Sequence, residues 1–106
     1  MNAINMKQDP AVLEEVLATL DLQAKKFPGK AIEVRIPPYA AIQCGQGPRH
    51  TRGTPPNVIE MAATTWLALA SGATTWADAL NRGAIDASGS LADLSAHLPL
   101  TGEVTP

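Results

Sequence analysis

The residues best suited to chemistry lie in the middle of the chain. Cys44 is the single cysteine, and the stretch that follows it, GQGPRHTRGTPP, carries Arg49, His50 and Arg52. A thiolate nucleophile needs a nearby base, so Cys44 and His50 form one candidate catalytic pair. However, Cys44 falls on the inward side of an expected strand, where a cysteine is most often a small inert hydrophobe. An enzyme that uses Cys44 or His50 is therefore the weakest of our hypotheses.

The two arginines suggest a binding role instead. The forked donors of Arg49 and Arg52 could clamp a carboxylate or a phosphate, with N–H groups of the loop helping. Alternatively, the glycines and prolines only shape a wide connection and the arginines are solvated. Neither His50 nor His97 has a second ligand-type residue at metal spacing, and no catalytic or phosphate-binding motif occurs. We therefore expect no catalytic residue, no metal and no cofactor.

Composition limits the protein class. The 106 residues form one expected domain (1–106), with a core over about 10–100 and a flexible tail at 101–106. Hydrophobic residues make up 45% and charged residues 17%, which is typical of a globular chain. The net charge of −2 disfavours a nucleic-acid partner. No apolar run approaches the roughly 20 residues of a membrane helix, so stable membrane insertion is not expected. The start has no signal peptide, which together with the lone cysteine predicts a cytoplasmic protein.

Periodicity predicts the elements that must position these residues. Asp9-Pro10 is a helix start, and apolar residues at helical spacing predict an amphipathic helix over 10–26, with Val12, Leu13, Val16, Leu17 and Leu20 on one face. Alternation in KAIEVRIPP predicts a strand. YAAIQCG is its expected antiparallel partner, and NVIEM is a third strand.

The second half of the chain predicts short elements. Helices are expected over 62–72 and 75–82, the second one capped by Thr75 and Asp78 with Trp76, Ala79 and Leu80 facing inward. A short strand follows at 84–88. A last helix is expected at 90–98, where Ser90 and Asp93 form the cap and Leu91, Leu94 and Leu98 form a stripe. The order of elements predicts an α+β fold with a mostly antiparallel sheet of four to five strands and helices packed on one face.

The stretch NVIEMAATTWLALASGATTWADALNRGAIDASGSLADLSAHLPL resembles the sterol carrier protein (lipid-transfer) family. More narrowly, EVRIPP, GPRHTRGTPPNVIE, TWADAL and ADLSAHLPL resemble its small stand-alone bacterial members. The resemblance covers about residues 10–100. It implies a hydrophobic ligand space between sheet and helices that binds fatty acyl chains, sterols or other lipids without catalysis. Larger members have more strand before the NVIEM equivalent, where this chain has its proline-rich loop.

Two further hypotheses follow from this resemblance. One is a closed-core accessory or dimerisation module, because related domains also occur fused behind helical domains. The favoured one is a carrier, whose expected partner is a hydrophobic small molecule or lipid, with a homodimer left open. Its apolar pocket would involve Ile42, Ile59, Met61, Trp66, Leu69, Trp76, Leu80, Leu94 and Leu98. Arg49 and Arg52 would receive a polar head group at the rim.

Overall fold

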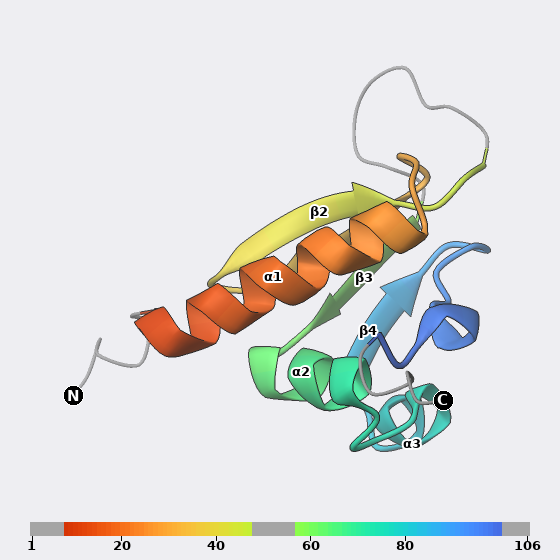
Figure 1. Cartoon of the computed structure of the whole chain (residues 1–106). Coiled ribbons are helices and arrows are strands. Elements are labelled where there is room, and N and C mark those ends of the chain that lie inside the picture. The colour runs from red at the N-terminus through yellow and green to blue at the C-terminus, as the bar shows by residue number, and fades with distance from the viewer. Residues whose placement is uncertain (1–7, 48–56, 101–106) are drawn as a thin grey trace, which may run out of the picture.

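The fold is a four-stranded sheet with helices packed on one of its faces (Figure 1). The computed structural model describes residues 8–47 and 57–100. Its elements are α1 (Pro10–Lys26), β1 (Ile32–Ile36), β2 (Ala40–Cys44), β3 (Asn57–Met61), α2 (Ala63–Ser71), α3 (Trp76–Asn81), β4 (Ile85–Ser88) and the short 3₁₀ turn η2 (Ser95–His97). The α+β class is confirmed, and the first helix and first three strands lie where periodicity predicts them.

Helix α1 runs along β2 and packs on both β2 and α2 (Figure 1). Asp9 caps its first turn, since the side-chain oxygen accepts a 2.9 Å hydrogen bond from the N–H of Ala11. Its buried face is formed by Val16, Leu20 and Gln23. Leu17 was expected on that face, but its side chain is 49% exposed. It follows Val16 by one residue, and one residue turns the helix by about 100°, away from the core.

The sheet is mixed. The strand order is β2-β1-β3-β4, with β1 antiparallel to β2, β3 antiparallel to β4, and the central pair β1–β3 parallel. The parallel pair arises because the chain leaves β2 at one edge and returns on the opposite side of β1. Alternation within single strands predicts their faces but not this pairing. Two of the three pairings are therefore antiparallel, as expected, and the third is not.

The two faces of the sheet differ in polarity. Ile32, Val34 and Ile36 of β1 are buried beneath the helices. On the opposite face, Arg35 donates to Glu33 at 2.7 Å and lies 4.0 Å from a carboxylate oxygen of Glu60. These ion pairs remain partly exposed, and such pairs contribute little stability. The helices therefore cover one face only, and the other is polar.

Helices α2 and α3 are joined by a tight turn. Gly72 ends α2 in the left-handed conformation at φ 87°, which favours glycine. Thr75 begins α3, because its hydroxyl accepts a 3.1 Å hydrogen bond from the N–H of Asp78. Trp76 and Ala79 are buried, whereas Leu80 is 45% exposed. The prediction that Leu80 faces inward is therefore wrong, since α3 buries only the face that carries the other two residues.

The helix expected over 90–98 is also absent from the described residues. Only Ser95–His97 is helical there, as one 3₁₀ turn. Asp93 accepts a 2.8 Å hydrogen bond from the N–H of Ser95 instead of pairing with Ser90. Leu91 is 38% exposed, while Leu94 is fully buried. The leucine spacing is typical of a helix, but the backbone N–H and carbonyl groups of this segment form local turns instead.

Candidate functional site

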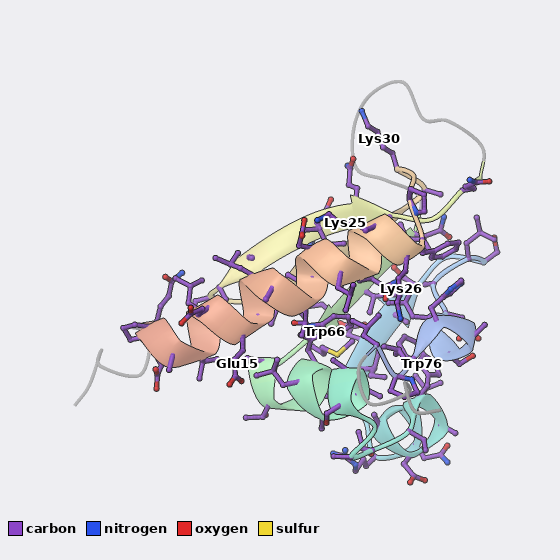
Figure 2. All side chains as sticks on the ribbon, in the orientation of Figure 1. Glu15, Lys25, Lys26, Lys30, Trp66 and Trp76 are labelled. Carbon is purple, nitrogen blue, oxygen red and sulfur yellow. The ribbon has the colours of Figure 1, made fainter. Side chains whose placement is uncertain are left out.

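Most of the apolar residues expected to bind a ligand lie in one core. Six are buried in it, namely Ile59, Met61, Trp66, Leu69, Trp76 and Leu94. Ile42 and Leu98 are partly buried against it, and Leu80 is not part of it. Arg49 and Arg52 lie outside the described residues. Figure 2 shows Trp66 between α1 and α2, and Trp76 farther along toward α3 and the 3₁₀ turn. The structure therefore brings eight of the nine expected apolar residues together.

Three of these side chains, Leu69, Trp76 and Leu98, line a partly open cavity of about 400 Å³. They come from α2, α3 and the segment after η2. We call this hollow the α2–α3 cavity. Its other lining residues are Gly72, Thr74, Thr75, Ala77, Ser95 and Pro99. Its volume falls within the roughly 300–1,000 Å³ of small-molecule sites, and an apolar floor with a few polar rim groups is typical of them.

Backbone hydrogen bonds hold the walls of the cavity in place. The N–H of Leu100 donates to the carbonyl of Ala70 at 2.8 Å, which ties the chain after η2 to α2. The N–H of Ala73 donates to the carbonyl of Ala68 at 2.8 Å and closes the end of α2. The cavity is thus bounded by elements that are fixed independently of any ligand.

A second hollow of about 500 Å³ adjoins the first. Lys26, Ala96, His97, Leu98 and Pro99 line it, so Leu98 and Pro99 separate the two hollows. The ring of His97 stacks on Phe27, with centroids 3.8 Å apart and ring planes at 18°. Lys26 Nζ donates to the carbonyl of Leu100 at 3.2 Å. The segment that carries Leu98 is therefore fastened to the end of α1 as well as to α2.

Two polar side chains are buried among the described residues, Gln23 and Asn57. Asn57 is fully paired: its Nδ2 donates to the carbonyl of Ala31 and its Oδ1 accepts from the N–H of Leu91. Gln23 Nε2 donates to Cys44 Sγ at 4.0 Å, while its Oε1 has no partner. Neither residue is predicted from the sequence to be buried. Only the spacing of Gln23, three residues after Leu20 on the apolar face of α1, could have indicated that it is buried.

The structure disfavours a nucleophilic role for Cys44. Its side chain is fully buried, and burial raises the pKa of the thiol, while the hydrogen bond from Gln23 lowers that pKa by a smaller amount. A thiol whose pKa lies above the ordinary value of 9.0 is almost entirely protonated at neutral pH, and the protonated form is a poor nucleophile. His50, the other member of the candidate pair, lies outside the described residues. In the folded chain Cys44 is thus a packing residue.

The raised pKa of Cys44 gives a testable pH dependence. The unfolded chain ionises this thiol near pH 9.0, whereas the folded chain holds the proton to higher pH. The stability that this thiol contributes is therefore fully present below pH 9. Above pH 9 the free energy of unfolding falls, by up to about 1.4 kcal/mol for each pH unit. Urea unfolding between pH 8 and 10 should show this slope in the wild type and lose it in Cys44→Ala. An equal slope in both proteins would contradict the assignment.

Residues 8–47 and 57–100 contain neither a metal-binding cluster nor a membrane-spanning helix. No group of three or more histidine, cysteine or acidic side chains there is arranged to hold a metal ion. No helix in those ranges is long and apolar enough to cross a bilayer.

Comparison with known families accounts for most of the chain. The family model described as "Bacterial SCP ortholog" matches residues 9–100, which includes every described helix and strand and every residue that lines the α2–α3 cavity. No curated protein sequence matches the chain significantly.

Proposed function

Because the chain belongs to the bacterial SCP ortholog family, which is sterol carrier protein-like, we propose that it binds a hydrophobic ligand and transfers it unchanged. The family suggests lipid binding or transfer in general. The ligand class that we propose includes fatty acyl chains, sterol-like molecules and other lipids. Binding of this kind needs an apolar space and no catalytic group, which agrees with the buried, protonated thiol of Cys44.

The α2–α3 cavity is the observation that carries the proposal. Leu69, Trp76 and Leu98 converge on it from three separate segments, namely α2, α3 and the chain after η2. Each buried methylene of a ligand contributes roughly 0.8 kcal/mol, so about six methylenes would contribute roughly 5 kcal/mol before the costs of ordering. Thr74, Thr75 and Ser95 at the rim supply hydroxyl groups that can meet the polar end of a ligand or water.

A closed core is the second candidate, and the burial of Trp66 favours it. Trp66, Ile59 and Leu94 are all fully buried by their neighbours in the protein. A chain of this kind would act as an accessory or dimerisation module, and the cavity at the surface would be a shallow feature without a ligand. The two candidates differ in whether lipid binds at all.

Native mass spectrometry of the freshly purified protein, followed by lipid extraction, separates the two candidates. A discrete added mass that extracts as a fatty acid, phospholipid or isoprenoid supports the carrier and gives the ligand class. A clean apo mass that remains after incubation with a lipid panel contradicts the carrier and favours the closed core.

A cavity-blocking substitution tests where the ligand binds. Ala77 is exposed and lines the cavity, so Ala77→Trp should fill the mouth and weaken lipid binding about tenfold or more, while it changes stability little. Ala18→Trp is the matched control, because Ala18 is an exposed helical alanine of α1 that does not line the cavity. Binding titrations that show equal affinities for the two variants would remove the cavity from the site.

A further inference from the structure

We infer that two copies of the protein form a symmetric dimer through strand β2, which joins their sheets into one. The surface lies outside the α2–α3 cavity, so the inference does not depend on whether a lipid binds. Strand β2 is the outermost strand of the sheet and pairs with β1 along one edge (Figure 1). Among the described residues, no strand lies along its other edge.

Backbone groups of β2 point toward this open edge. The N–H of Ala31 donates to the carbonyl of Gly45 at 3.1 Å, so these two residues form a bonded pair at one end of the β1–β2 ladder. Bonded and non-bonded pairs alternate along an antiparallel ladder. Ile42, opposite Val34, therefore belongs to a non-bonded pair and directs its N–H and carbonyl away from β1. Such outward groups are a ready template for pairing with another strand.

The side chains of β2 suit pairing with an identical strand. In a two-fold dimer the same surface of both copies meets, so a charge near the axis would face its own copy. The five residues of β2, AAIQC, include no charged residue and no proline. The opposite edge strand, β4, carries the exposed Asp86, and a charge of this kind protects an edge from pairing. The edge formed by β2 lacks that protection.

Helix α1 brings an apolar side chain to the level of the middle of β2. The N–H of Asp9 donates to the hydroxyl of Tyr39, just before β2, at 3.2 Å. Near the other end of the helix, Gln23 Nε2 donates to Sγ of Cys44, the last residue of β2, at 4.0 Å. The helix and the strand therefore run in the same direction, and Leu17 lies about midway between the two contacts.

Leu17 lies on the side of α1 that faces away from α2. Thr19 is on the α2 side, because its hydroxyl accepts a 2.8 Å hydrogen bond from Trp66. Two residues turn a helix by about 200°, so Leu17 is nearly opposite Thr19, on the side of the open β2 edge. It is 49% exposed, the highest value among the large apolar side chains of the described residues. A two-fold axis through the middle of β2 would bury Leu17 against its own copy, above a contact between the two Ile42 side chains.

Sedimentation velocity of the full-length protein over a range of concentrations tests the dimer. Wild type should be mostly dimeric at about 100 µM and dissociate on dilution, as expected for an interface of modest size. Leu17→Lys should raise the dissociation constant about tenfold or more, because it removes the apolar contact and brings two ammonium groups together at the axis. Leu80→Lys is the matched control and should dimerise like the wild type. Leu80 is 45% exposed on α3, which packs on β4 at the far edge of the sheet.

Amide hydrogen exchange of the wild type locates the interface without any variant. The N–H of Ile42 should exchange more slowly at high concentration than at low concentration, because pairing with a second β2 occupies it. A protein that stays monomeric up to about 500 µM would overturn the inference. So would a dimer in which the exchange of Ile42 does not change with concentration, or one that Leu17→Lys and Leu80→Lys weaken equally. Growth beyond two copies would also contradict it, since pairing of β2 with its own copy closes the assembly.

Discussion

Replacing Trp66 with alanine should lower the free energy of unfolding by about 3–5 kcal/mol, the largest single effect that we expect in this chain. The indole is fully buried between α1 and α2, and its Nε1 donates to Thr19 Oγ1 at 2.8 Å. The Thr19 hydroxyl in turn donates to the carbonyl of Glu15 at 2.7 Å, which leaves its lone pair for the indole. The alanine variant removes both the ring volume and this bond. Urea unfolding at low temperature measures the loss, which is a large fraction of the stability of a small domain.

Trp66→Phe serves as the partner variant, because it keeps an aromatic ring and loses the N–H group. We expect its loss to be well below that of the alanine variant, since most of the contribution comes from packing. A phenylalanine variant as unstable as the alanine variant would mean that the bond to Thr19 dominates.

The same alanine variant distinguishes the carrier from the closed core. If the ligand space reaches the interior, the volume vacated by Trp66 should change ligand uptake as well as stability. If the core is closed, only stability should change. Lipid binding measured on the variant at a temperature where it stays folded gives the answer.

Local pattern predicted much of the fold. Asp9-Pro10 and the apolar spacing after it placed α1 at its observed bounds, and strict alternation around Val34 placed β1. These patterns predict α1 and β1 correctly because capping and alternation depend only on residues close together in the chain. The parallel pairing of β1 with β3 depends on where a distant segment returns, and no residue within either strand encodes that return.

The site was predictable as a set of apolar residues but not as a cavity. Trp76 and Leu69 are residue types expected in a core. Whether that core is filled or hollow depends on how side chains from different elements pack together. Gln23 was not predicted because one polar residue on an apolar face gives no sign in sequence of whether it is paired. The helix expected at 90–98 does not form because local turns take its place: the N–H of Asp93 donates to the carbonyl of Leu91, and the Asp93 side chain accepts from the N–H of Ser95.

Asn57→Ala should lower the free energy of unfolding by about 2–4 kcal/mol. Its amide joins three parts of the fold: it belongs to β3, donates to the carbonyl of Ala31 at 2.9 Å and accepts from the N–H of Leu91 at 2.8 Å. The side chain is 3% exposed, so water does not readily replace it. Alanine would leave two backbone groups without their partner at the junction of β1, β3 and the turn after β4.

Asn81→Ala is the matched control, because Asn81 is exposed at the end of α3 and should change stability by less than about 0.5 kcal/mol. Amide hydrogen exchange locates the effect, since the N–H of Leu91 should exchange faster in Asn57→Ala than in the control. Because Leu91 begins the segment whose far end carries Leu98, ligand affinity should fall together with this protection. Equal stability and equal Leu91 exchange in the two variants would mean that the turn keeps its position without the asparagine, and that the contacts with α1 and α2 are enough to position the cavity wall.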